Sequence, residues 1–315
     1  MSDTERLEMT KALLTDLIGF ASISAVNNLD LIDYCAGVLA PLGAKLEFSR
    51  SDDGHRANLF ATLGPDSDGG IVLSGHTDVV PVEGQDWASD PFTASERDGR
   101  IYGRGACDMK GFLACCLAMA PEFAAKATDR PFHLAFTYDE ETGCLGAGVL
   151  MEALAASGRR PAVCIVGEPT LMRVIEGHKG CHEFTTRFTG LEGHTSDPDR
   201  GVNAIDYAVR LVGEIHRIAE QLKARAPHNS PFSPPWSTIQ AGRIDGGIAR
   251  NVIAGECCVE WDLRPVNDAD TDFALQRMHA CEAALRGEMQ SRFRDADIRT
   301  ETNGAVAGLD PMTQS

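Results

Sequence analysis

Three short apolar runs, each leading into a histidine or a carboxylate, constrain the fold more than any other feature of this chain. The runs are Gly70–Leu73, Pro131–Tyr138 and Val163–Val166, and they lead into His76, Asp139-Glu140-Glu141 and Glu168. Short continuous apolar segments are typical of strands buried in a parallel sheet. Because the carboxyl ends of parallel strands meet at one edge of a sheet, the pattern predicts that these polar side chains gather there.

Two of these motifs also have an ordinary interpretation. The adjacent acids Glu140 and Glu141 repel each other, so a cation, a proton or open water must relieve them. By themselves they are equally consistent with a solvated surface turn. A neutral His76 can bind a metal through one nitrogen, while Asp78 accepts the N–H of the other nitrogen and so orients the ring. Without that neighbour, His76 would be interpreted as a structural histidine.

Two further carboxylates extend the pattern. Asp108 lies in the glycine-punctuated segment Tyr102–Gly111, just before a helix predicted over residues 112–123. A loop aspartate before a helix is by default an N-cap, but the surrounding glycines indicate a backbone held close to another group. Glu168 by itself would be an ordinary exposed strand end. The recurrence of such residues at one predicted sheet edge favours a shared site.

The mixture of imidazole and carboxylates predicts a catalytic site for zinc, cobalt or manganese. Structural zinc sites are rich in cysteine, and no cysteine pair stands at ligand spacing here. Cys107 and Cys144 lie near the predicted site and are interpreted as structural thiols rather than ligands. One acid can bridge two ions, and a carboxylate beside the ligands can deprotonate a shared water. The residues therefore predict a two-metal hydrolase.

The pattern of expected elements divides the chain near Gly177. Before it, apolar strands alternate with helices, as in a doubly wound, mostly parallel α/β sheet; after it, strand residues alternate with a period of two. The later elements are predicted as a strand at 183–188, a helix at 202–222 with Ile205, Val209, Val212, Ile215 and Leu222 near one face, strands at 236–241 and 251–264 around a turn at 245–247, a helix at 269–293 and a strand at 296–302. That order, β-α-β-β-α-β, is a ferredoxin-like α+β layer.

Four motifs of the chain resemble the co-catalytic zinc amidohydrolases of the M20 metallopeptidase family. They are Ser74–Asp78, Arg104–Gly111, Asp139–Gly143 and Gly167–Thr170. The resemblance also includes residues 24–34 and 51–53 and reaches at least Arg264. It implies that residues 1–177 form the catalytic metal-binding domain and residues 178–303 an inserted lid and dimerisation domain.

The resemblance also assigns roles at the predicted site. It implies two divalent metal ions, zinc or alternatively cobalt, bridged by Asp108. His76 and Glu168 would complete the coordination of the first ion, and Glu141 would bind the second. Glu140 matches the general base, which takes a proton from water and returns it to the leaving amine.

Four other residues match positions of the family. Asp78 would keep its orienting role. His194 matches a lid histidine that reaches a neighbouring subunit's site and stabilises the oxyanion. Asn251 and Arg264 match lid positions that bind the substrate carboxylate, for which a guanidinium fork is well suited. From the residues alone, His194 would be a turn histidine and the other two would be polar strand ends.

The implied reaction is hydrolysis of an N-acyl amino acid, with N2-acetyl-L-ornithine of arginine biosynthesis as the expected substrate. Succinyl-diaminopimelate and other N-acyl amino acids are the near alternatives. A different class of alternative is an inactive, shortened homologue that acts as a dimerising partner. It arises because the family's second ion takes a last histidine from a carboxyl-terminal segment, whereas beyond His228 this chain offers only His279.

We therefore expect residues 304–315 to begin a return to the first domain, whose remainder, with the last ligand, is missing. Without the strands around that ligand, the core would expose an apolar sheet edge, and exposed edges are prone to pair with other chains.

Composition limits the partners and the compartment. A formal net charge of −17 argues against nucleic acid and anionic membranes, because both need a basic surface. No signal core or membrane-spanning stretch is expected. The ten cysteines include Cys115-Cys116 and Cys257-Cys258 inside apolar runs, which is typical of buried thiols in a reducing compartment. We therefore expect a cytoplasmic enzyme with a small-molecule substrate, dimeric through its lid.

Overall fold

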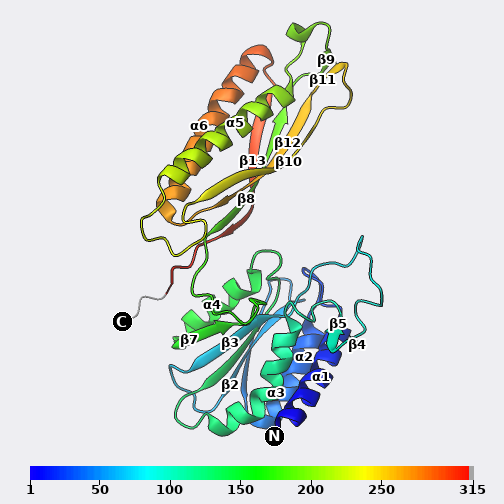
Figure 1. Cartoon of the computed structure of the whole chain (residues 1–315), viewed down its shortest axis with the longest axis vertical. Helices are drawn as coiled ribbons and strands as arrows, with labels where there is room; N and C mark the ends of the chain where they lie inside the picture. Colours follow the sequence, from blue (N-terminus) through cyan, green and yellow to red (C-terminus); the bar gives the residue numbers. More distant parts are fainter. Residues whose placement is uncertain (312–315) are drawn as a thin grey trace. The chain divides into compact units, whose positions relative to one another are not determined.

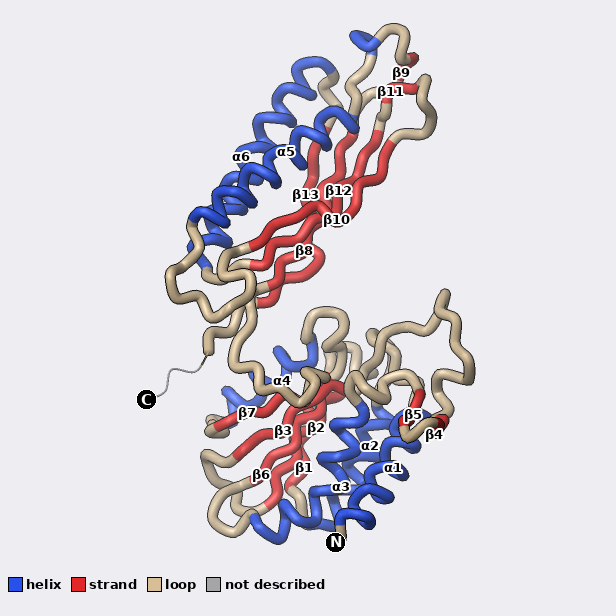
Figure 2. Tube along the Cα trace, viewed as in Figure 1, coloured by secondary structure: helices blue, strands red, loops and turns tan. Residues whose placement is uncertain are grey.

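The computed structural model describes residues 1–311 of the chain. The chain separates into two units, Met1–Arg173 and a second unit from Val174 onward. Each unit contains one principal sheet covered by helices (Figures 1 and 2). The mixed α/β fold expected from the sequence is confirmed.

The principal sheet of the first unit has five strands in the order β1-β2-β6-β3-β7. They are β1 (Lys45–Arg50), β2 (Ala57–Leu63), β3 (Ile71–His76), β6 (Phe132–Thr137) and β7 (Val163–Val166). Strands β6, β3 and β7 run parallel and coincide with the three apolar runs, whereas β1 pairs antiparallel with β2, and β2 with β6. The sheet is therefore parallel in the half that carries the predicted site.

Helices cover both faces of this sheet, as in a doubly wound fold. The bounds are α1 (Asp3–Gly19), α2 (Leu29–Leu39), α3 (Lys110–Lys126) and α4 (Leu145–Ser157), with a short helix η1 (Ala40–Leu42) and a separate hairpin of β4 (Ser95–Arg97) and β5 (Arg100–Tyr102). Helices α1, α2 and α3 pack on the face that presents Leu59 and Phe136. Helix α4 packs through Leu150 on the opposite face, against Phe60. Strand β2 is accordingly buried on both faces.

The outer strand β7 differs from the centre of the sheet. Within residues 1–311 it pairs only with β3, and its apolar residues Val163, Ile165 and Val166 are exposed. The exposed apolar edge expected from the sequence is thus observed at β7, and such an edge is a template for pairing with another strand.

The principal sheet of the second unit has four strands in the order β10-β12-β8-β13, all antiparallel. Its elements are β8 (Cys181–Thr189), β9 (Gly193–His194), η2 (Pro198–Arg200), α5 (Ala204–Ala224), β10 (Thr238–Gly246), β11 (Val252–Ile253), β12 (Glu256–Arg264), α6 (Asp268–Arg292) and β13 (Asp297–Val306). Leaving out the short pair β9 and β11, the chain order is the ferredoxin-like β-α-β-β-α-β that the sequence predicts.

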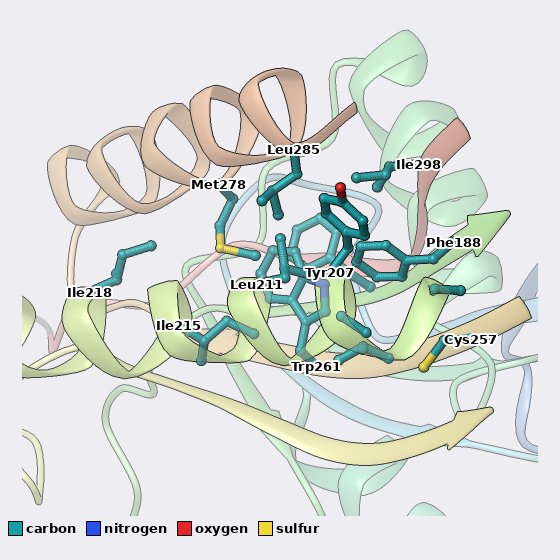
Figure 3. Close-up of a cluster of buried hydrophobic side chains, with 14 of the residues drawn as sticks. Phe188, Tyr207, Leu211, Ile215, Ile218, Cys257, Trp261, Met278, Leu285 and Ile298 are labelled. Atoms are coloured by element: carbon teal, nitrogen blue, oxygen red, sulfur yellow. The ribbon is translucent and has the colours of Figure 1, made fainter. Parts of the chain in front are cut away.

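Side chains of α5 and α6 and one face of this sheet form the core of the second unit (Figure 3). Trp261 lies at its centre: its ring stacks on Phe184 with centroids 4.2 Å apart, and its Nε1–H donates to Thr186 Oγ1 at 2.9 Å. Burying a side chain of this size contributes roughly 1.5–3 kcal/mol. The indole also satisfies its one polar atom, so its burial leaves no unpaired donor.

Some details of the second unit differ from the prediction. Val209 is exposed on α5, while Leu211 and Ile218 are buried, because the sheet packs against a neighbouring stripe of the helix that includes Leu211, Ile215 and Ile218. Strand β10 continues through Gly246, which pairs with Cys257, so the chain reverses after the turn expected at 245–247 rather than within it.

The cysteines are also only partly as expected. All ten are free, but Cys115 is exposed while Cys116 is buried, because neighbouring residues of a helix point in different directions. Among residues 1–311, none of the helices combines the length and the apolar character needed to cross a membrane.

Strand β13 extends to Val306, and Leu309 forms an antiparallel bridge with His178. Residues 312–315, part of the segment expected to return to the first domain, lie outside the described residues.

Candidate metal centre

The carboxyl ends of three parallel strands bring the predicted ligands together. His76 is the last residue of β3, Glu140 and Glu141 follow β6, and Glu168 follows β7. Asp108 reaches the same place from the loop before α3. Two groups of possible ligands result, and within each group one ligand atom of every residue lies within 4.8 Å of the others. The groups are His76, Asp108 and Glu168, and His76, Glu140 and Glu141.

The imidazole of His76 lies at the centre of this cluster. Its Nε2 is 3.0 Å from Asp108 Oδ1 and 3.8 Å from both Glu168 Oε1 and Glu140 Oε2. No lysine or arginine of residues 1–311 forms an ion pair with any of the four acids, Asp108, Glu140, Glu141 and Glu168. Four acids that share one imidazole and have no lysine or arginine partner repel one another, and nitrogen with carboxylate oxygen is a common donor set for catalytic zinc. The residues present therefore fit a divalent metal.

Asp108 does not act as the N-cap of α3. That helix starts at Lys110, and its cap position is Met109, without a side-chain capping bond. The glycines around Asp108 mark close packing, as expected: a Cβ on Gly105 would meet Val79 Cγ1 at 2.7 Å, and one on Gly111 would meet a backbone oxygen at 2.5 Å. The loop is thus packed tightly enough to set where Asp108 lies.

Asp78 is buried and organises the site differently from the prediction. His76 Nδ1 lies 2.9 Å from the backbone oxygen of Asp78 and 3.5 Å from its carboxylate. The carboxylate instead accepts hydrogen bonds from Ser24 Oγ at 2.7 Å and from the backbone N–H groups of Glu140 and Glu141 at 3.0 and 3.3 Å. The nearest acceptor for the imidazole is therefore main chain, and the carboxylate holds the backbone of the acid pair.

Burial and neighbouring charges shift the protonation of these groups. Burial alone would lower the pKa of His76, but Asp78 and the nearby acids raise that pKa to about 9. Burial raises the pKa of Glu168 to about 7, and the charge of Asp108 adds to this against the opposing charge of His76. Burial and the charge of Asp108 also raise the pKa of Glu141. A metal would have to displace protons from such ligands.

The residues predicted for the lid all lie in the second unit. His194 and Asn251 are exposed and close to each other, because β9 pairs with β11 and Thr195 N–H donates to the backbone oxygen of Asn251 at 3.3 Å. Arg264 ends β12, at the strand terminus remote from β11, where it forms an ion pair with Asp262 at 2.8 Å. His279 is exposed on α6 and belongs to neither group of possible ligands.

Sequence reasoning missed the contacts of Asp139, the acid that precedes the pair. Its carboxylate is buried, forms an ion pair with Arg56 and accepts a hydrogen bond from Ala25 N–H at 2.7 Å. The sequence did contain a signal: three acids stand in a row, and the pair Glu140-Glu141 accounts for only two of them.

Comparisons with known proteins agree with this geometry. The model of peptidase family M20/M25/M40 matches residues 72–307. The chain is 38% identical over 262 residues to an acetylornithine deacetylase of Edwardsiella ictaluri, covering 81% of this chain and 67% of that protein. It is 38% identical over 267 residues to one of Yersinia pestis, covering 82% and 68%. The match thus spans about two thirds of the length of these relatives.

Solved structures share the fold at low sequence identity. The aminopeptidase PepT of Bacillus cereus superposes with a TM-score of 0.69 at 18% identity, covering 98% of this chain and 78% of that chain. The YXEP protein of Bacillus subtilis, described as a dinuclear metal-binding peptidase, gives a TM-score of 0.61 at 15% identity, covering 97% and 76%.

Proposed function

The chain belongs to peptidase family M20/M25/M40, and we propose that this metal-dependent amidohydrolase removes the acetyl group of N2-acetyl-L-ornithine, giving L-ornithine and acetate in arginine biosynthesis. The observation that carries the proposal is the cluster of four acids around the buried imidazole of His76, without a lysine or arginine partner among residues 1–311. The relatives named acetylornithine deacetylase support the choice of substrate.

Two divalent ions, zinc or cobalt, would be held by His76, Asp108, Glu141 and Glu168. Bound there, they would polarise the acyl oxygen and lower the pKa of a water molecule. The remaining chemistry falls to the chain's own residues.

Glu140 serves as the proton carrier. Its carboxylate lies at the rim of the cluster, with Oε2 3.8 Å from His76 Nε2, and its backbone is fixed by Asp78. It takes a proton from the attacking water as the oxygen bonds to the acyl carbon. It then gives that proton to the amine nitrogen as the C–N bond breaks, so the proton is returned within one turnover.

The second unit supplies substrate contacts in this proposal. His194 would reach the site of a neighbouring subunit and donate a hydrogen bond to the oxyanion that develops on the substrate there. Asn251 and Arg264 would bind the carboxylate of the amino acid. A homodimer formed through this unit and a cytoplasmic location belong to the same proposal.

A substrate comparison tests the function. The zinc-loaded and cobalt-loaded protein is assayed for amine release from N2-acetyl-L-ornithine, N-succinyl-diaminopimelate and N-acetyl-methionine. We expect kcat/KM for acetylornithine to exceed the others by about tenfold or more, the size of discrimination that a well-fitted pocket gives. Preference for the succinyl substrate would replace the proposed substrate, and no turnover of any of them would overturn the function.

The composition of the cluster favours a second candidate, an inactive homologue that dimerises. The two ligand groups share His76, and in the described part of the chain no second histidine joins Glu141. Titration with zinc distinguishes the two: one ion per chain without turnover supports the inactive form, and two ions with turnover support the enzyme.

A further inference from the structure

We propose that Arg56 is a positioning residue for the acid pair Glu140-Glu141 and that it acts through Asp139. The inference rests on the proposed function, because it concerns how the base and a ligand of that reaction are held. It also gives a role to the region around residues 51–53, which the mechanism does not use.

Asp139 holds the backbone at the start of the acid pair in an unusual conformation. It is the second residue after β6, and its φ of 51° is in the left-handed region that side chains other than glycine rarely adopt. Its carboxylate is only 1% exposed. The two donors that hold this carboxylate are the N–H of Ala25, at 2.7 Å, and the guanidinium of Arg56. A buried carboxylate needs such partners.

Arg56 ties this carboxylate to a rigid part of the fold. It precedes β2, the strand buried throughout its length. Its second terminal nitrogen binds Asp53 at 2.8 Å, and its guanidinium lies 5.6 Å from the centre of the Tyr138 ring. A planar guanidinium can serve two carboxylates at once, which a lysine ammonium does less well.

The acid pair is thus held from two sides. Asp78 binds the N–H groups of Glu140 and Glu141, and Arg56 holds the residue immediately before them. Without Arg56, the buried charge of Asp139 is left without its cationic partner, and the segment must shift to reach water. Such a shift moves Glu140 and Glu141 relative to His76, so it lowers both turnover and metal affinity.

Arg159 provides a matched control in the same unit. It also joins two carboxylates, Glu47 at 3.2 Å and Asp66 at 2.9 Å, and it lies 5.7 Å from the centre of the Phe60 ring. It belongs to the loop after α4 and makes no contact with the acid pair. Replacing either arginine removes a similar set of interactions, but only one of them holds Asp139.

The experiment compares Arg56→Met, Arg56→Lys and Arg159→Met in the full chain. It measures the melting temperature, zinc affinity by calorimetry, and kcat and KM for N2-acetyl-L-ornithine. We expect both methionine variants to melt at lower temperature. Only Arg56→Met should lose about 10- to 100-fold in kcat and in zinc affinity, the usual cost of removing a group that orients ligands. Arg56→Lys should recover part of both losses.

Asp139→Asn and the double variant with Arg56→Met test the route of the effect. If Arg56 acts through Asp139, the double variant loses no more than the worse single variant, because the residues act as one unit. Unchanged kcat and zinc affinity in Arg56→Met, or equal losses in Arg159→Met, would overturn the inference. Absence of turnover in the unaltered chain would instead count against the proposed function, and the zinc affinities would still test the positioning role.

Discussion

The catalytic edge of the first unit and the sheet of the second unit follow local structural rules to different degrees. Strand β12 alternates regularly: Cys257, Val259, Trp261 and Leu263 are buried, and none of the residues between them is. At the ends of β3 and β6, by contrast, His76 and Asp78 are buried, Asp139 has a positive φ, and two acids are adjacent.

The contrast shows which interactions hold each region in its folded conformation. The second unit buries apolar surface on one sheet face, so most of its stability is expected to come from packing. The edge of the first unit buries charges that cost free energy unless they are paired. Departures from local rules of this kind concentrate at functional sites. Substitutions in the first region should therefore affect chemistry, and those in the second should affect folding.

The largest expected effect is on turnover. Glu140→Gln removes the proton carrier but preserves its shape, so kcat should fall by about 10²- to 10⁴-fold, the usual contribution of a general base. Zinc binding measured by calorimetry should persist. Glu152→Gln, on the exposed side of α4, is the control and should have normal kcat. Undiminished turnover in Glu140→Gln would contradict the assigned role.

The next effect is on folding of the second unit. Trp261→Ala should cost about 3–5 kcal/mol of unfolding free energy, because it empties the centre of the core. Trp261→Phe keeps one aromatic ring but loses the pyrrole half of the indole and its bond to Thr186, and it should cost at least about 1 kcal/mol. Urea unfolding followed by circular dichroism measures both. The distinction between the regions would be lost if Trp261→Ala reduced kcat without reducing stability.

The third effect is a pH dependence of metal binding. The pKa values of about 9 for His76 and about 7 for Glu168 lie above the ordinary 6.5 and 4.5. Their contribution to the stability of the metal-free protein is therefore complete below the ordinary values and is lost as the pH rises through 7 and 9. Metal binds the deprotonated ligands, so stabilisation by metal should grow in the same range.

Thermal unfolding with and without cobalt, at pH 6 and pH 9, measures this dependence. We expect the stabilisation by metal to be larger at pH 9 by about 3–5 kcal/mol, because each pH unit below the pKa of a ligand costs about 1.4 kcal/mol when the metal displaces its proton. His76→Asn should abolish most of the difference. Equal stabilisation at both pH values would show that these ligands do not exchange protons for metal.

The smallest effect concerns a part of the first unit that follows local rules. Ser2 caps α1: its Oγ accepts from Glu5 N–H at 3.3 Å, and its own N–H donates to the Glu5 carboxylate at 2.7 Å. Ser2→Ala should cost about 1 kcal/mol of stability and leave kcat unchanged, with the exposed Thr4→Ala as the neutral comparison. A fall in kcat would show that the catalytic edge is not distinct from the rest of its unit.

Local patterns in the chain predict the three parallel strands at the candidate site, the elements of the second unit and the residue types that gather at the site. Strands β3, β6 and β7 follow from apolar runs, and the ligands from the polar residues that end them. The ferredoxin-like order of the second unit follows from the change of period. These features are local, because hydrophobic period and the chemistry of neighbouring residues are properties of a short segment.

The partners of those residues, by contrast, depend on the folded chain. Arg56 and Asp139 are 83 positions apart, and nothing in either segment identifies the other. The carboxylate of Asp78 binds backbone N–H groups 62 and 63 positions away in addition to lying 3.5 Å from His76 Nδ1. The antiparallel pairing of β1 and β2, and the exposure of Val209 and Cys115, likewise depend on the elements packed against them. Local pattern specifies which groups must be buried or paired, but their partners are set by contacts between distant segments that exist only in the folded chain.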